Sequence, residues 1–212
     1  MKTSLLILFM SFFAIISSAQ TFFKIKTGIN FSRPVYAYDF NNKLTEDYKK
    51  NKTGFCGGFV LHHFFNEILS VQAELLYSQK GLKIVQNPYG TTINTMNYIE
   101  MPVSGQYSLF KTKNTFLNIY IGGYTAYWIS GAYKITDYYT GETVSTKVDF
   151  NNADYSYERI DAGISAGLSY RFNDNAELYL VYSHGMIESA KENVDGFLNR
   201  LFSFGINFIV LK

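Results

Sequence analysis

Long stretches of this chain alternate apolar side chains with small or polar ones. From Arg159 to Phe172, every even-numbered position is apolar or aromatic, and every odd-numbered one is charged, Ser or Gly. Because successive side chains of a β-strand point to opposite faces, this period of two predicts a strand with one apolar and one polar face. In a water-soluble barrel the apolar face points inward. In a transmembrane barrel it points outward to lipid.

The same pattern recurs along the chain and predicts eight strands. They are Phe22–Phe31, Gly54–Phe64, Leu69–Gly81, Asn97–Phe110, Thr115–Ile129, Glu158–Phe172, Ala176–His184 and Arg200–Val210.

The connections between these strands alternate strictly between tight and long. Tight connections are expected at 65–68, 111–114 and 173–175, and long ones at 32–53, 82–96, 130–157 and 185–199. Bacterial outer-membrane barrels have an even strand number, short periplasmic turns and longer outer loops, whereas a soluble sandwich has no reason to sort its loops by side. The sequence therefore predicts an all-β fold, an eight-stranded antiparallel up-and-down transmembrane β-barrel.

The two faces can be assigned strand by strand. The residues expected to face lipid include Ile99, Met101, Val103, Tyr107 and Leu109; Leu117, Ile119, Ile121, Tyr127 and Ile129; and Phe202, Phe204, Ile206, Phe208 and Val210. The second strand alternates poorly, because Gly57 and Gly58 blur its pattern and His62 and His63 point to opposite faces. Pro102 predicts a bulge or bend, since proline cannot donate a ladder hydrogen bond.

The N-terminal residues have the features of a secretory signal peptide. Lys2 is followed by an apolar run, Leu5–Ile16, and by the small residues Ser17-Ser18-Ala19. The run is too short to span about 30 Å of hydrocarbon as a helix, and Gln20 stands where a lipoprotein would need Cys. We therefore expect a cleaved signal peptide at residues 1–19 and an outer-membrane barrel domain at 20–212.

Composition agrees with this picture and excludes some partners. Aromatic residues make up 18% of the chain, and Tyr and Phe suit strands and membrane boundaries. The formal charge of +2 is too small to indicate nucleic acid or a strongly acidic partner. The single cysteine, Cys56, cannot form an internal disulfide.

Three segments resemble a known family. They are Ser70–Gly81 (SVQAELLYSQKG), Tyr98–Val103 (YIEMPV) and Gly163–Leu168 (GISAGL). In these segments, and in the order and spacing of the whole chain after the signal peptide, the protein resembles the small PorT-like outer-membrane β-barrels of Bacteroidota. The resemblance implies an eight-stranded barrel but no assigned activity. Such barrels often end on an aromatic residue, whereas this chain continues past Phe208 to Leu211-Lys212.

Several charged residues fall on the expected inner face. They are Lys24, Lys26, Glu74, Lys80, Glu100, Asp161, Arg171 and Glu177. An eight-stranded barrel is just wide enough for side chains to fill it, so buried charges must pair or hold trapped water. We expect a structural polar network, with Glu74, Glu100 and Arg171 or a lysine at its centre. A gated or proton-conducting path is the alternative.

Nothing in the sequence indicates catalysis. The three histidines are too scattered to form a metal site, and neither a nucleophile motif nor a phosphate loop has the required context. We therefore expect no enzymatic activity, no cofactor and no bound metal.

The long loops leave two interpretations open. The segment Tyr133–Phe150 resembles a hairpin above the membrane, with a turn at Thr140-Gly141-Glu142 and many aromatic residues nearby. This segment is part of the loop at 130–157. That loop and the loop at 32–53 are either solvated connections or a contact surface for an extracellular ligand.

The expected function is accordingly a structural or surface-interaction role in the outer membrane. The expected partners are outer-membrane lipid and the barrel insertion machinery. The alternatives are narrow-channel transport of small solutes or ions, and a secreted barrel that carries an apolar ligand.

Overall fold

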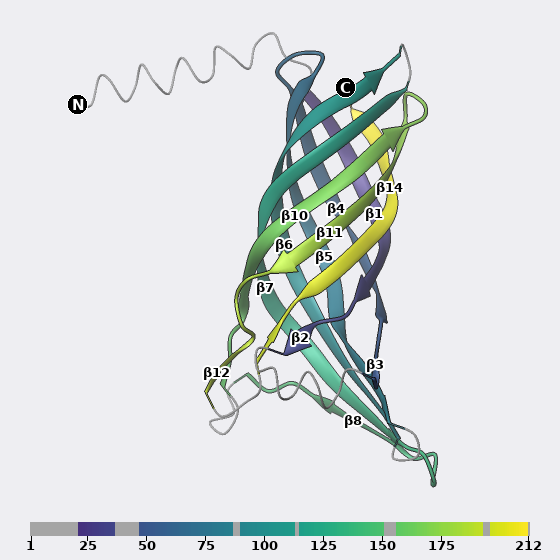
Figure 1. Ribbon diagram of the computed structural model, residues 1–212, viewed down its shortest axis with the longest axis vertical. Coiled ribbons are helices and arrows are strands. Elements are labelled where there is room, and N and C mark those ends of the chain that lie inside the picture. The colour runs from purple at the N-terminus through teal and green to yellow at the C-terminus, as the bar shows by residue number, and fades with distance from the viewer. Residues whose placement is uncertain are drawn as a thin grey trace, which may run out of the picture.

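A computed structural model describes residues 21–36, 47–86, 90–112, 115–150, 156–192 and 196–211. The expected signal peptide lies outside these residues. Within them, eight antiparallel strands form a closed ring, because the first ring strand pairs with the last (Figure 1). In ring order they are β1 (Thr21–Ser32), β4 (Lys52–Phe64), β5 (Leu69–Gln86), β6 (Gly90–Lys111), β7 (Phe116–Asp137), β10 (Ile160–Arg171), β11 (Ala176–Gly185) and β14 (Arg200–Leu211). The predicted barrel is confirmed.

Among the described residues, six shorter strands gather at the end of the barrel opposite the tight turns (Figure 1). They are β2 (Val35–Tyr36), β3 (Lys49–Lys50), β8 (Thr143–Lys147), β9 (Ser156–Tyr157), β12 (Ala190–Glu192) and β13 (Phe197–Leu198). β2 pairs with β13 and β9 with β12, while β3 and β8 add to β5 and β7. Among the described residues, no helix is long and apolar enough to cross a membrane.

The tight turns are held by side chains that bond to the backbone. Asn66 Oδ1 accepts hydrogen bonds from the amides of Ile68 and Leu69, each at 2.8 Å. In the turn after β10, Asn173 Oδ1 accepts from two amides in the same way. Asn favours such turns because its short side chain mimics a backbone carbonyl. Both turns were predicted as tight connections.

The expectation of a long loop at 82–96 was wrong. β5 continues to Gln86 and β6 begins at Gly90, so most of this segment is a hairpin that extends the barrel wall (Figure 1). Beyond the membrane neither face of a strand meets lipid, so the sequence there loses its period of two and resembles a loop. The hairpin expected within Tyr133–Phe150 is confirmed: β7 reaches Asp137 and pairs with β8, with Gly141 at a φ of +69° in the turn.

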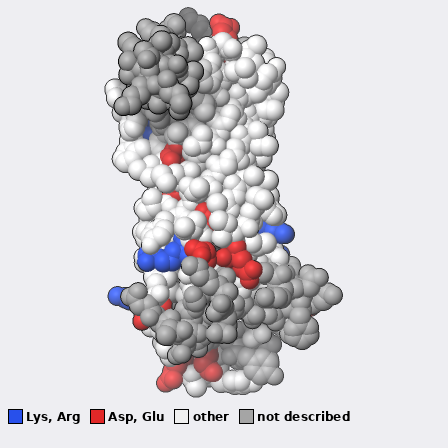
Figure 2. Space-filling model, turned by 90° about the vertical axis from the view of Figure 1, so that its left-hand side faces the viewer, with Lys and Arg blue, Asp and Glu red and all other residues white. Residues whose placement is uncertain are grey.

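The outward faces are apolar, as predicted. Ile121 is 69% exposed on β7, while its neighbour Tyr120 is 7% exposed and points inward. Ile164, Leu168, Phe202 and Phe204 are likewise exposed. On the face shown in Figure 2, few charged atoms interrupt the barrel wall, and charged residues gather in a band where the loops begin. This apolar surface suits a lipid environment.

The structure has no bulge at Pro102, where the sequence predicted a bulge or bend. Pro102 pairs with Tyr124 of β7 in unbroken register, but the pairing of β5 with β6 is interrupted between Ala73–Val103 and Leu76–Glu100. Register shifts occur instead between Asn97 and Tyr98 and between Ser108 and Phe110. Proline lacks an N–H, and here the consequence is an interrupted ladder rather than an inserted residue.

The first of these shifts changes which residues of β7 face inward. Tyr98 pairs with Trp128 and Asn97 with Ser130, so Ile129 is the extra residue. Before it the even-numbered residues of β7 face the lumen. After it Tyr133, paired with Asn94, lies on the inner face.

Candidate functional site in the barrel lumen

All eight charged residues that the sequence places inside the barrel are buried there, none more than 9% exposed. They comprise four cations (Lys24, Lys26, Lys80 and Arg171) and four carboxylates (Glu74, Glu100, Asp161 and Glu177). The set is therefore neutral overall when all eight are ionised. Buried charges are tolerated only when they are paired and hydrogen-bonded.

The first group lies toward the tight turns. Lys24 Nζ is 2.9 Å from Glu177 Oε2, and the Asn207 amide donates to the other carboxylate oxygen at 3.0 Å. Arg171 stacks its guanidinium over the rings of Phe22 and Phe116, at 4.7 and 4.8 Å from their centroids. Aromatic faces attract a cation, so this end of the lumen is filled by rings and charges together.

The second group lies in the middle of the lumen. Lys26 Nζ is 2.7 Å from Glu74 Oε2, and Gln72 donates to the other oxygen of Glu74. Gln106 in turn donates to Gln72 at 3.0 Å. Lys26 also lies 4.2 Å from the centroid of the Tyr179 ring. These contacts give the Glu74 carboxylate partners on both oxygens.

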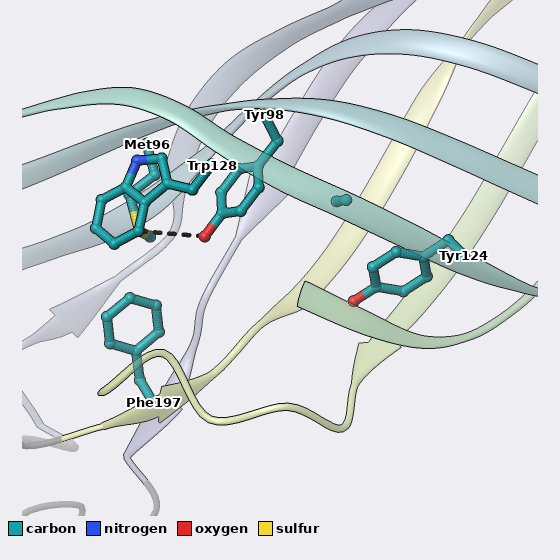
Figure 3. Close-up of a cluster of buried hydrophobic side chains, with 6 residues drawn as sticks. Met96, Tyr98, Tyr124, Trp128 and Phe197 are labelled. Atoms are coloured by element: carbon teal, nitrogen blue, oxygen red, sulfur yellow. Dashed lines mark hydrogen bonds between the residues drawn. The ribbon is translucent and has the colours of Figure 1, made fainter. Parts of the chain in front are cut away.

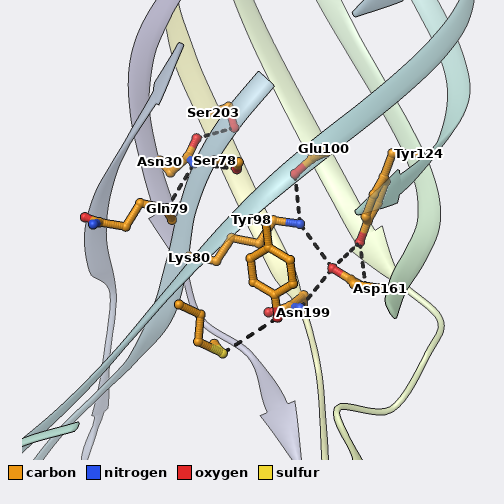
Figure 4. A network of polar contacts seen from close by, with 11 residues as sticks. Asn30, Ser78, Gln79, Lys80, Tyr98, Glu100, Tyr124, Asp161, Asn199 and Ser203 are labelled. Atoms are coloured by element: carbon orange, nitrogen blue, oxygen red, sulfur yellow. Dashed lines mark hydrogen bonds and ion pairs between the residues drawn. The ribbon is translucent and has the colours of Figure 1, made fainter. Parts of the chain in front are cut away.

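The third group lies toward the long loops and centres on Lys80. Its ammonium is 3.0 Å from Glu100 and 3.1 Å from Asp161 (Figure 4). Asp161 also accepts a hydrogen bond of 2.9 Å from Asn199 and one of 3.3 Å from the Tyr124 hydroxyl. Two carboxylates thus share one lysine, and neutral donors complete the surroundings of Asp161.

Sequence reasoning missed the neutral members of the network. Asn30 donates to Ser78 Oγ at 3.1 Å and accepts from Ser203 Oγ at 2.7 Å (Figure 4). His62 bonds to Ser70 at 2.8 Å. A signal was available, because these residues share the inward parity of the charged ones. His63 lies on the other face of β4, as predicted.

Aromatic side chains close the lumen beyond Lys80. Met96, Tyr98, Tyr124, Ala126, Trp128 and Phe197 form a buried cluster (Figure 3). The Trp128 indole donates to the Ser130 carbonyl at 2.8 Å, and its ring packs edge-on against Phe150 and Tyr157. Phe197 comes from a segment predicted only as a loop, so its part in the cluster was not foreseen.

A small cavity remains within the lumen. It has a volume of about 30 Å³ and is lined by residues that include Lys26, Glu74, Glu100 and Ser104. A space of this size holds on the order of one or two water molecules. In the described part of the chain, no group of three or more His, Cys, Asp or Glu side chains is arranged to hold a metal ion.

Comparison with known proteins agrees with this architecture. A family model described as "Outer membrane protein beta-barrel domain" matches residues 18–191. No curated protein matches.

Similar solved structures include the attachment invasion locus protein Ail of Yersinia pestis in complex with sucrose octasulfate, at 14% identity and a TM-score of 0.46, covering 90% of this chain and 99% of Ail. They also include Neisserial surface protein A, at 14% identity and a TM-score of 0.49, covering 91% and 99%. OprG of Pseudomonas aeruginosa is 9% identical with a TM-score of 0.45, covering 90% and 96%. The family match spans most of the chain, and this protein belongs to the outer membrane protein beta-barrel domain family, with the outer membrane as its location.

Proposed function

We propose that this protein has a structural or surface-interaction role in the outer membrane and no catalytic activity. The observation that carries the proposal is the division between a filled lumen and an extended outer end. Inside, the four cations and four carboxylates of the lumen network are buried beneath an aromatic cluster. Outside, the sheet of β5, β6, β7 and β8 extends beyond the barrel (Figure 1).

The extended sheet offers the surface for such an interaction. Its tip exposes large apolar and aromatic side chains, including Tyr139 at 76%, Val144 at 64% and Tyr138 at 59%. Exposed apolar residues on a rigid support are typical of contact surfaces. The outer ligand surface expected at 32–53 and 130–157 stays part of this proposal; residues 37–46 and 151–155 of it lie outside the described residues.

We also propose membership of the PorT-like group of Bacteroidota barrels, with export through a signal peptide at 1–19 and assembly by the barrel insertion machinery. Two of the segments that resemble this group, Ser70–Gly81 and Tyr98–Val103, support the grouping because they lie side by side. Leu76 of β5 pairs with Glu100 of β6, and Ser78 pairs with Tyr98. They form one continuous patch of barrel wall.

Transport and ligand carriage have less support. Narrow-channel transport would need a water path through the lumen, where the cavity within the polar network is about 30 Å³. A secreted carrier of apolar ligands would need an apolar lumen, and here the inward residues are largely charged or polar.

Planar-bilayer recording tests the closed lumen. We expect purified protein, folded in detergent and added to the bilayer, to give no stable open-pore conductance, because the charged groups and the aromatic cluster occupy the lumen. Heat-modifiable gel migration of the same sample confirms that it is folded. Large, steady single-channel currents would contradict the proposal and favour transport.

A further inference from the structure

A second cavity lies beyond the Trp128 cluster, on the inner face of the extended sheet. Its volume is about 250 Å³. The described lining residues are mainly aromatic and aliphatic, and none of these is charged: Tyr36, Leu82, Ile84, Thr92, Asn94, Tyr133, Tyr157 and Phe197.

The register of the extended sheet builds one wall of this cavity. Leu82 pairs with Asn94 and Ile84 with Thr92, so these side chains share a face. Tyr133 joins them because the extra residue Ile129 changes the parity of β7 and places Tyr133 opposite Asn94. The register shift is therefore what makes the wall aromatic.

Three further aromatic rings come from the short strands at the barrel mouth. Tyr36 and Phe197 are paired with each other across β2 and β13, and Tyr157 belongs to β9. The hydroxyls of Tyr133 and Tyr157 lie 2.9 Å apart, which ties β9 to the sheet. The cavity is thus held by rings from four separate strands.

One polar atom in the cavity lacks a partner. Asn94 is 6% exposed, and its Oδ1 has no hydrogen-bond partner among the described residues. A buried acceptor without a partner is costly, because it has lost its water. Such an atom in a mainly apolar cavity is placed to accept a hydrogen bond from a ligand.

We propose that this cavity binds a small, neutral aromatic molecule that carries one hydroxyl or N–H donor. Its ring would lie among the tyrosines and Phe197, and its donor would bond to Asn94 Oδ1. The volume suits a single-ring molecule, since pockets for drug-sized ligands start at about 300 Å³. A sugar fits less well, because its many hydroxyls would meet the aliphatic Leu82 and Ile84.

The chain contains its own reporter for binding. Trp128 is the one tryptophan in the sequence. Its ring centroid is 5.4 Å from that of Tyr157, which lines the cavity. A molecule that enters the cavity should therefore change the tryptophan fluorescence, whereas one that only dissolves in the micelle should not.

The experiment titrates folded, micellar protein with benzyl alcohol, toluene or glucose. We expect saturable binding of benzyl alcohol, weaker binding of toluene, and none of glucose. In Asn94→Leu the affinity for benzyl alcohol should fall roughly tenfold to the level of toluene, which corresponds to one lost hydrogen bond. Thr91→Leu, a matched change at a position outside the cavity lining, should bind like the wild type.

Other results would overturn the proposal. They are equal affinities of wild type and Asn94→Leu for benzyl alcohol, tighter binding of glucose than of benzyl alcohol, or no saturable binding. If Asn94→Leu fails to show the folded form on a gel, Ile84→Phe replaces it; this variant fills the cavity and should abolish binding of both aromatic probes. Ligand binding in this cavity is a property beyond the proposed function. The titration measures neither conductance nor orientation, so the binding proposal and the proposed function can fail independently of each other.

Discussion

At the scale of single residues, the buried lysines differ in how many carboxylates they meet. Within the described chain, Lys24 has one carboxylate at ion-pair distance, that of Glu177. Lys80 has two, those of Glu100 and Asp161. Removing one carboxylate therefore leaves Lys24 without a counter-charge but leaves Lys80 with one.

This difference predicts unequal costs for two alanine substitutions. Glu177→Ala should lower the free energy of unfolding by about 3–5 kcal/mol, because an unpaired charge stays buried, and Glu100→Ala by clearly less. Urea unfolding in lipid vesicles measures both. The double variant Lys24→Met/Glu177→Leu should recover most of the loss; an equal loss in the double variant would show that the charge pair is not the cause.

A second residue-scale prediction concerns the lipid-facing surface. Leu168 is 46% exposed on the outward face of β10. Leu168→Arg should destabilise the protein in vesicles by about 2–4 kcal/mol if the residue lies near the bilayer midplane, because hydrocarbon does not solvate the charge. Tyr139→Arg, at the exposed tip of the outer hairpin, is the control and should change the stability by about 0.5 kcal/mol or less.

At this scale the sequence predicts faces but not partners. Period-two parity is a local property, so the inward position of Lys24 and of Glu177 could be read directly from their neighbours. Their pairing joins residues 153 positions apart and depends on strand register around the whole ring. No local pattern contains that information.

At the scale of elements, the outer hairpin of β7 and β8 depends on its turn. Asp137 Oδ1 accepts hydrogen bonds from the amides of Thr140 and Tyr139, each at 2.8 Å. These amide donors, with that of Thr140 first, hold the pKa of the Asp137 carboxyl below its ordinary value. Ionisation of one carboxylate thus helps to order the hairpin tip.

Acid should therefore weaken the turn that Asp137 holds. Because the folded pKa is depressed, the stabilisation is present above the ordinary aspartate value of about 3.9 and is lost as pH falls through the lower folded pKa. We expect the Thr140 and Tyr139 amides to exchange faster with solvent at that acidic end, as measured by NMR. In Asp137→Asn, which keeps the acceptor but does not titrate, this acceleration should be absent. Its persistence there would assign the effect to another group.

Element lengths were the least predictable part of the fold. The barrel-wall portions of β5 and β6 were recognised because one face must be apolar for lipid. Their outer portions were not recognised. There Leu82 and Ile84 face the second cavity, and the intervening Lys83 and Val85 are one charged and one apolar residue, so the outer face shows no consistent polarity. Phe197 and Tyr157 were likewise unpredictable as cavity residues, because strands of two residues carry no periodicity.

At the scale of the whole molecule, tight turns and extended sheet lie at opposite ends (Figure 1). A barrel with this asymmetry should expose the extended end outside the cell. A short tag at Gly141 should therefore be labelled on intact cells, and one at Asp174 only after the membrane is permeabilised. Equal labelling at both sites before permeabilisation would contradict this orientation.

Ring closure has a kinetic consequence. The seam that closes the barrel joins β1 to β14, where Thr27 meets Ile206. These strands are far apart in the sequence, so the chain loses conformational entropy in bringing them together before their contacts stabilise the fold. Folding is therefore slow and cooperative. Until β14 arrives, β1 and β11 both present open edges, which are sites of misassociation. The newly made chain must therefore be kept apart from its copies until its last strand is available, and a chain shortened before residue 200 should aggregate rather than form a smaller barrel.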